Sequence, residues 1–464
     1  MSIQPLIEQA LSVMDETDLA PKTVRKKRDK GYAPATYHGK NVTPPLTFDA
    51  DQGWEVATKQ GARLDLAIRN VGSAVEERAM ALRQPLTLTL EQITEMRADL
   101  NKRKADHWSH WREKKPTDDA EALSEALLLR PGARSVTFTS QAQYEDHVRA
   151  TLTHVSGELR KQDQLDKHIG DGKDDVLDHG QKKCYRAAET VLMREVSRFT
   201  PGDSGQSAWV MHQARLDSQA RISALKEIRP MGGEYPDGFL IEKTERGKHP
   251  TPSHSAARHI VATTATVLPS DWVASAGRRH PTLQVEMGPE DESTRWMASS
   301  RRGGPYSPEL RVKLKRTANE CSPSDHGPMT EDESDALHEM GHHMESAYPE
   351  INQIARTHKA LRTTGIDGQL DSIEVVVHET EADLSPRPER MDTANDLHGW
   401  GRPGSFTATY AGQETGPSAS EVFSTGLEAA LGGRYGSLKG HGGVSADPEH
   451  LNLILGILAT VGRR

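Results

Sequence analysis

Hydrophobic residues recur at three- and four-residue steps through most of the first half of the chain. Within residues 6–14 this spacing predicts a short amphipathic helix, and from about residue 58 to residue 230 it predicts a series of longer ones. The stretch between them, 21–52, is rich in Lys, Arg, Pro, Thr and Gly and is expected to be an extended linker. We therefore expect an arm with a short helix at 1–57 and a helical region of unknown role at 58–235.

The pattern changes near residues 230–255, where prolines and glycines accumulate. Short strand-like runs follow, and a helix that carries a His-Glu pair comes after them. Strands followed by such a helix predict an α+β domain over 236–464, behind the mostly helical N-terminal region. The expected strands are 259–268, 283–287, 294–298 and 310–314.

Apolar and charged residues alternate from residue 310 onward, which is typical of a half-buried strand. A strand of this kind shortly before the His-Glu helix suits a sheet edge along a cleft. Such an edge could hold an extended peptide by main-chain hydrogen bonds. An ordinary amphipathic strand explains the alternation equally well.

Composition narrows the classes of partner. The 58 basic and 67 acidic residues are well mixed and give a formal charge of −9, so nucleic acid is not an expected partner. No apolar run reaches membrane-spanning length, and the first residues lack a basic segment followed by an apolar one, so we expect no membrane segment and no secretory signal. We expect synthesis in the cytoplasm. Cys184 and Cys321 are too few for a disulfide framework.

The clearest chemical motif is His338-Glu339-Met-Gly-His342. Residues four apart project from one face of a helix, so the two imidazoles could occupy two corners of a tetrahedral Zn²⁺ site. Glu339 lies beside them and could act as the general base on zinc-bound water. Ser334 or Asp332 is expected to cap this helix. A charged helix with solvated histidines is the alternative interpretation.

A catalytic zinc site needs a third protein ligand and an open position. Residues 410–431 read as a loop entering a helix, with Glu421 near its start. Glu421 is the favoured third ligand, and Glu428, two turns later, is an alternative. Helix-dipole complementarity alone could also explain an acidic residue at the position of Glu421.

Other ligands are less favoured. His343 points about 100° away from the face shared by His338 and His342. The metzincin pattern needs Gly at 345 and His at 348, where this chain has Glu345 and Tyr348, so that class is excluded. No spacing favours the remaining candidates, His358, His378, His398 and Cys321.

Four segments together resemble a known family: Gly-Gly-x-Tyr-Ser-Pro at 303–308, Leu-His-Glu-Met-Gly-His-His at 337–343, Tyr-Ala-Gly at 410–412 and Ser-Glu-Val-Phe-Ser-Thr-Gly-Leu-Glu at 420–428. They look like the gluzincin-type zincin domains of phage and mobile-element proteins, and more distantly the lethal-factor-like toxins. The resemblance covers about 255–464. It implies a small twisted sheet, an active-site helix with two histidine ligands, and a later helix that supplies a glutamate ligand, here Glu421.

We therefore expect a zinc-dependent metallopeptidase that acts on a peptide or protein substrate. Tyr410 is the expected donor to the oxyanion of the transition state, with Tyr348, His398 and Tyr435 as weaker alternatives. Two other functions remain open. One is a phage-particle-associated or delivered structural component with a vestigial or structural zinc site, and the other is a delivered toxin protease. In the structural component, the arm at 1–55 and the helical region would serve protein docking. In the toxin, the helical region would serve loading and the zincin domain would cut a host protein.

Overall fold

The elements of the fold come from a computed structural model of the chain. It describes residues 2–17, 19, 45–49, 54–109, 123–169, 177–199, 206–242, 256–279, 282–287, 295–299, 307–312, 329–364, 374–377, 398–401, 406–407, 411 and 420–463.

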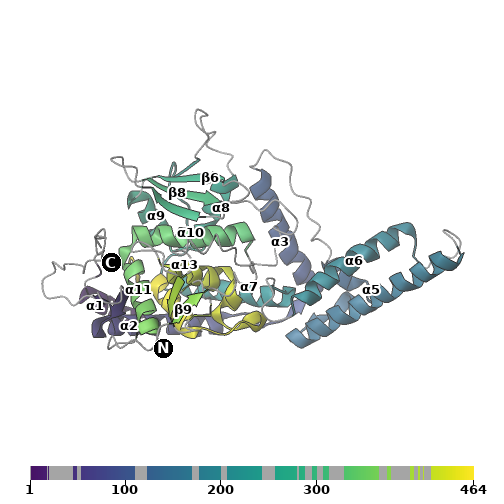
Figure 1. The fold of residues 1–464 in the computed structure, drawn as a ribbon, viewed down its shortest axis with the longest axis horizontal. Coiled ribbons are helices and arrows are strands. Elements are labelled where there is room, and N and C mark those ends of the chain that lie inside the picture. Colours follow the sequence, from purple (N-terminus) through teal and green to yellow (C-terminus); the bar gives the residue numbers. More distant parts are fainter. Residues whose placement is uncertain are drawn as a thin grey trace.

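Helices dominate this part of the chain (Figure 1). The α-helices are α1 (Gln4–Asp15), α2 (Lys59–Leu82), α3 (Leu90–Ser109), α4 (Leu123–Leu128), α5 (Gln141–Ile169), α6 (His179–Ser197), α7 (Ala208–Lys226), α8 (Ala256–Thr264), α9 (Ser270–Arg279), α10 (Glu331–Ala347), α11 (Pro349–Thr364), α13 (Glu421–Leu427) and α14 (Pro448–Thr460). A π-helix, η5 (Glu428–Gly432), continues α13, and short 3-10 turns are η1 (Ala133–Ser135), η6 (Tyr435–Leu438) and η7 (His441–Gly443). None of the described helices is long and apolar enough to cross a membrane.

The described strands form one four-stranded sheet and three two-stranded sheets. β1 (Leu46–Asp49) pairs with β2 (Trp54–Ala57), β3 (Leu88–Thr89) with β4 (Thr137–Phe138), and β9 (Glu374–Val377) with β10 (His398–Gly401), all antiparallel. The larger sheet contains β5 (Leu240–Glu242), β6 (Leu283–Met287), β7 (Arg295–Ser299) and β8 (Ser307–Val312) in the order β5-β6-β8-β7. β5, β6 and β8 run parallel to one another, and β7 is antiparallel to β8. Helices combined with a small sheet agree with the predicted α+β class.

The structure corrects one sequence expectation about the sheet and decides between two interpretations of another strand. The run 259–268 was expected to be a strand, but residues 256–264 form α8, because Ala256, Ala257, Ile260 and Val261 all bury on one helical face. For the strand near residue 310 the sequence left an edge strand and an ordinary amphipathic strand equally open, and the position of β8 between β6 and β7 excludes the edge. The described edge strand beside it is β7, and both β7 and β8 contact α10.

The larger core joins elements from both ends of the chain. Residues of α1, α2 and α7 pack in it with residues of α8, α10, α13 and α14. The approach between α2 and α14 is closest at Gly72 and Gly456, where an added Cβ would lie 1.7 Å from the Asn452 carbonyl oxygen and 2.0 Å from that of Ile68. The boundary at residues 235 and 236 remains a prediction, but this core extends across it.

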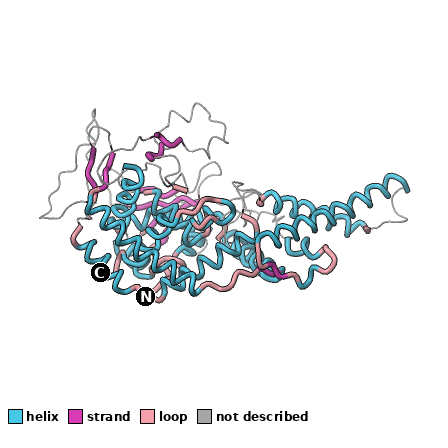
Figure 2. Tube along the Cα trace, turned by 90° about the horizontal axis from the view of Figure 1, so that it is seen from below, coloured by secondary structure: helices cyan, strands magenta, loops and turns pink. Residues whose placement is uncertain are grey.

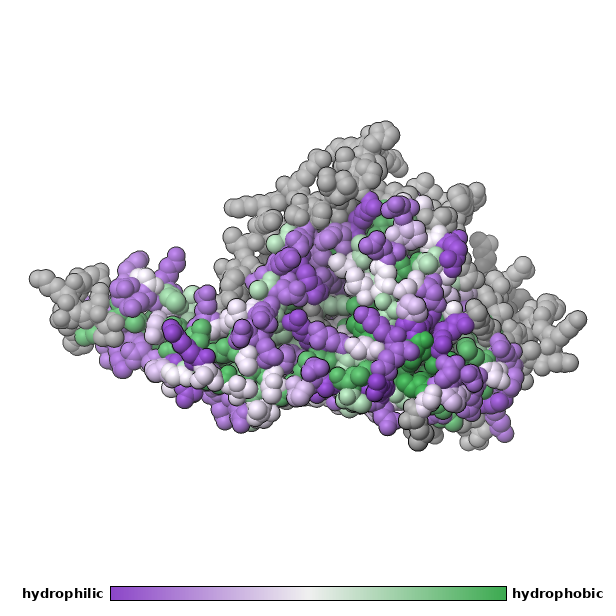
Figure 3. All heavy atoms as spheres, turned by 180° about the vertical axis from the view of Figure 1, so that it is seen from behind, coloured by the Kyte–Doolittle hydropathy of each residue, from purple (hydrophilic) through white to green (hydrophobic). Residues whose placement is uncertain are grey.

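A smaller core organises residues 88–211, within the region that was expected to be helical. Its most extended part is the antiparallel pair α5 and α6, which projects from the rest of the molecule in two perpendicular views (Figures 1 and 2). In the view from behind, hydrophilic and hydrophobic residues are interspersed along the described surface (Figure 3). The short helix expected at 6–14 is present as α1, whereas most of the expected linker at 21–52 lies outside the described residues.

Candidate metal centre

The helix that carries the His-Glu motif begins with a capping box. The Thr330 side chain accepts a hydrogen bond from the Glu333 backbone N–H, and the Glu333 side chain accepts one from the Thr330 N–H. The N-cap is therefore Thr330, and the expectation of Ser334 or Asp332 is wrong. Such reciprocal bonds satisfy two backbone donors that a helix start otherwise leaves unpaired.

Glu333 also attaches the N-terminal helical region to α10. Arg103 of α3 donates two hydrogen bonds to its carboxylate, and the His107 ring lies 2.9 Å from it. Burial opposes the charge on Glu333, but these contacts outweigh burial and lower its pKa to about 2. The start of the motif helix is thus held from two sides, by its own cap and by α3.

His338, His342 and Glu421 lie together, with all three potential ligand atoms within 4.8 Å of one another. The Nε2 atoms of His338 and His342 are 3.1 and 3.4 Å from the same Glu421 carboxylate oxygen. The three residues are 9%, 7% and 4% exposed. Two imidazole nitrogens and one carboxylate around a common point could hold a metal ion. The sequence predicted this grouping although Glu421 is far from the motif along the chain.

The opposite ring nitrogens meet two further carboxylates. The Nδ1 atom of His342 lies 3.1 Å from Glu345, and the Nδ1 atom of His338 lies 3.5 Å from Glu428. A carboxylate at Nδ1 fixes the ring orientation and makes Nε2 the metal-facing nitrogen. Glu428 is therefore placed behind His338 and not at the shared point, which corrects its prediction as an alternative third ligand. Glu345 was not identified from the sequence as part of the site.

Both outer carboxylates are themselves held in place. Glu428 is fully buried and accepts hydrogen bonds from the Ser334 hydroxyl at 2.6 Å and from Arg434 at 2.7 Å. Glu345 accepts a hydrogen bond of 2.9 Å from the backbone N–H of Ser420. Because Ser420 is the N-cap of α13, Glu345 connects His342 directly to the start of the helix that bears Glu421.

Close packing positions α13 against α10. A Cβ added at Gly341, inside the motif, would lie 3.0 Å from the Cα atom of Ser424, so only glycine allows this approach without a shift. The Ser424 hydroxyl donates a 3.0 Å hydrogen bond to Glu421. Behind α13, the buried Arg221 donates to the carbonyl oxygens of Ala430 in the π-helix and Ser437 in η6. The helix α13 with Glu421 is thus packed on α10, and the π-helix that begins with Glu428 is held from α7.

The electrostatics favour positive charge at the shared point. Burial alone would lower the pKa of His338, but hydrogen bonds with Glu421 and Glu428 raise it well above its usual range. Burial likewise opposes the charge on His342, yet Glu345 and Glu421 raise its pKa to about 10. Glu421 responds in the opposite sense, because the two histidines overcome its burial and hold its pKa far below the usual range. Without a metal, protons on the imidazoles supply the charge that the carboxylates require.

Burial has opposite outcomes for the two outer carboxylates. It raises the pKa of Glu345, since His342 only partly offsets it. Glu428 is also buried, but Arg434 and His338 lower its pKa to about 2. Glu339, the expected general base, is half-buried, and its charge contributes to the raised pKa of His338.

Other described candidates from the sequence make contacts away from this group. His343 is buried against Phe239, and His358 pairs with Asp65 at a distance of 2.7 Å, so neither belongs to the group. Tyr348 donates its hydroxyl to the backbone oxygen of Asp271.

Tyr435 is the one predicted alternative donor with a described relation to the group. It lies under the Arg434 guanidinium, 5.1 Å from ring centroid to Cζ. Burial raises its pKa to about 12 although Arg434 opposes the rise, and the charges of Glu428, Asp335 and Glu421 add to it. Its backbone is left-handed, with φ of 50°, a strained conformation that for non-glycine residues clusters at functional sites. The remaining candidates, which are Tyr410, His378, Cys321 and the side chain of His398, lie outside the described residues.

No family model, no curated protein and no solved structure matches the chain.

Proposed function

We propose that the protein is a zinc-dependent metallopeptidase whose metal ligands are His338, His342 and Glu421. The observation that carries this proposal is the convergence of both Nε2 atoms on one Glu421 oxygen while separate buried carboxylates hold both Nδ1 atoms. A catalytic zinc site typically has three such protein ligands, and carboxylates behind its histidines are common.

The residues fit zinc in donor type and number. When bound, Zn²⁺ would supply a Lewis acid that polarises a peptide carbonyl and activates water. Glu339, which follows His338 directly, would accept the proton of the attacking water and return it to the leaving amine nitrogen. Glu339 is half-buried, and its charge helps to raise the pKa of His338, which supports a place for its carboxylate near that ligand.

The edge strand β7 supports a role for an extended peptide as substrate. β7 contacts α10 and pairs with β8 along one side only among the described strands. Its outer edge would offer backbone N–H and C=O groups to a peptide that lies along it. This proposal moves the substrate-binding edge from β8, the predicted strand, to β7.

We propose Tyr410 as the donor to the developing oxyanion, with Tyr435 as its main alternative. Tyr435 has the support of its place beside Arg434, which donates a hydrogen bond to Glu428, the carboxylate behind His338. Removing one donor of this kind typically costs about 10²–10³ in kcat. Tyr410→Phe and Tyr435→Phe, compared in parallel, should show that loss in one variant and a nearly unchanged rate in the other.

The decisive variant for the reaction is Glu339→Gln. It should retain zinc, because Glu339 is not a ligand, and lose about 10²–10⁴-fold in the rate of cleavage of a broad peptide library. Glu77→Gln, on the exposed face of α2, is the matched control and should cleave at the wild-type rate. If wild type and Glu339→Gln both bind zinc and neither cleaves any peptide, the peptidase proposal fails and the result favours a structural or vestigial zinc site.

The projection of the α5–α6 hairpin favours a docking role for the N-terminal helical region. We propose that this region binds a protein partner, as either a particle-associated component or a delivered toxin would require. A variant with Arg160→Glu and Lys161→Glu on the exposed surface of α5 leaves the smaller core intact, and it should keep zinc and peptidase activity if the hairpin serves docking alone. Loss of zinc in that variant would instead assign the hairpin to support of the metal centre.

A further inference from the structure

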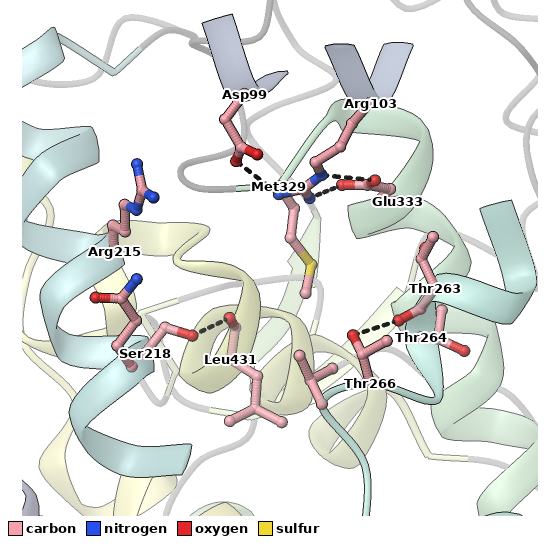
Figure 4. Close-up of a pocket in the computed structure, with 12 residues that line it drawn as sticks. Asp99, Arg103, Arg215, Ser218, Thr263, Thr264, Thr266, Met329, Glu333 and Leu431 are labelled. Atoms are coloured by element: carbon pink, nitrogen blue, oxygen red, sulfur yellow. Dashed lines mark hydrogen bonds and ion pairs between the residues drawn. The ribbon is translucent and has the colours of Figure 1, made fainter. Parts of the chain in front are cut away.

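A cavity lies between the helical region and the motif helix. Its volume is about 380 Å³, within the range of small-molecule sites. Residues of α3, α7, α8 and α10 line it, together with Leu431 of the π-helix (Figure 4). None of the metal-ligating residues lines it, so it is separate from the metal centre.

Most of the charge in this cavity is already compensated. Glu333 uses both carboxylate oxygens, for Arg103, His107 and the Thr330 N–H. Arg103 in turn also pairs with Asp99, at 3.5 Å. The carboxylates of the cavity are therefore not available to attract a cationic ligand.

Arg215 is the exception. This half-buried guanidinium lines the cavity from α7, and Figure 4 draws no interaction from it to any other lining residue. In the part of the chain that the structure describes, it has no hydrogen-bond or ion-pair partner. A guanidinium carries five N–H donors in a fork that matches a carboxylate, and a half-buried one gains from an anionic partner.

The hydroxyl groups of the cavity act as acceptors. Ser218 donates its proton to the Leu431 carbonyl at 2.6 Å, and Thr263 and Thr266 donate theirs to backbone carbonyls at 2.5 and 2.7 Å. Each hydroxyl has one proton and two lone pairs, so only acceptor capacity remains for a ligand. Val267, Met329 and Leu431 add apolar surface.

We propose that this cavity binds a small ligand with one carboxylate, at least one N–H donor and an apolar group, that is, an amino-acid derivative or short peptide with a free C-terminus. The carboxylate would pair with Arg215, the N–H groups would donate to the threonine and serine oxygens, and the apolar side chain would contact Met329 and its neighbours. A single unpaired guanidinium near Asp99 and Glu333 favours a monoanion over a dianion such as phosphate. The proposal does not depend on peptidase activity.

The test compares two probes that differ only at the C-terminus, N-acetyl-Leu-Leu with a free carboxylate and the same compound as its amide. Binding to the full chain is measured by isothermal titration calorimetry. A hydrogen-bonded charge pair predicts that the acid binds at least about tenfold more tightly than the amide. Arg215→Gln should remove this difference, Arg215→Lys should keep part of it, and Arg160→Gln on the exposed surface of α5 should leave it unchanged.

Three results would overturn the proposal. These are equal affinity of the acid and the amide for the wild type, no binding of the acid at millimolar concentration, and an unchanged preference for the acid in folded Arg215→Gln. If Arg215→Gln does not fold, the acid–amide comparison on the wild type decides alone. Binding at the metal centre would be recognised because Arg215→Gln would leave it intact and a zinc chelator would abolish it.

Discussion

Glu345 is predicted to control zinc affinity although it is not a ligand. One of its oxygens lies 3.1 Å from Nδ1 of His342 and 2.9 Å from the backbone nitrogen of Ser420. The carboxylate therefore orients a ligand on α10 and holds the start of the helix that carries Glu421. Glu345→Gln keeps the shape of the side chain but replaces an anionic acceptor by a neutral amide.

The expected cost follows from those two contacts. A hydrogen bond to a charged group contributes about 1.5–3 kcal/mol and a neutral one about 0.5–1.5 kcal/mol, so the amide oxygen can accept both bonds but each becomes weaker. A loss of about 2 kcal/mol corresponds to roughly a 30-fold weaker Kd, within the tenfold to 100-fold range typical of carboxylates behind metal ligands. The assay is competition for Zn²⁺ against a chromophoric chelator at constant pH.

The control for this experiment is Glu77→Gln, which removes one exposed carboxylate from α2 and should leave zinc affinity unchanged. Circular dichroism must show that Glu345→Gln is folded. A folded Glu345→Gln protein whose zinc Kd lies within a factor of two of the wild type would refute the orienting role of Glu345.

Three further predictions concern protons and packing. Zinc binding at pH 7 should release protons, because the raised pKa values of His338 and His342 keep their rings protonated in the metal-free protein. For the same reason, zinc affinity should increase as the pH rises toward about 10. Calorimetry in buffers of different ionisation enthalpy that finds no proton release would contradict this prediction. Burial lowers the pKa of His450, so its contribution to the free energy of unfolding is complete above the unfolded-state pKa of 6.5 and is lost as the pH falls below that value. In urea unfolding, His450→Gln should make the free energy of unfolding depend less on pH in this range. An equal dependence on pH in the wild type and the variant would count against the prediction. Gly341→Ala should destabilise the protein by about 1–3 kcal/mol and weaken zinc binding, because the added Cβ would lie too close to Ser424. An unchanged Tm and an unchanged zinc Kd would contradict tight packing at this position.

The sequence predicted the helices more reliably than the sheet, for a physical reason. Helical periodicity is local, so the motif helix and the short helix at 6–14 could be identified directly. The existence of strands at 283–287, 294–298 and 310–314 could also be predicted, but their neighbours could not. Strand order depends on pairing between distant segments, and alternation alone does not distinguish the inner β8 from the edge strand β7.

Within the candidate site, the roles of residues near the motif could be predicted from the sequence, whereas contacts between distant segments could not. Glu345 is three residues after His342 and so lies on the same helical face, a signal that the spacing contained. Thr330 and Glu333 likewise form a Thr-x-x-Glu capping box that could have been identified. The contact of Ser420 with Glu345 spans 75 residues, and no local pattern predicts it.

The central claim is that His338, His342 and Glu421 form one metal site for zinc. The most direct measurement is the metal content of purified wild type and Glu421→Ala, determined side by side by plasma mass spectrometry. The account predicts about one zinc per chain in the wild type and its loss in Glu421→Ala, because a carboxylate that meets both imidazoles would be absent. Wild-type protein without stoichiometric zinc, or a Glu421→Ala protein that retains it, would contradict the claim.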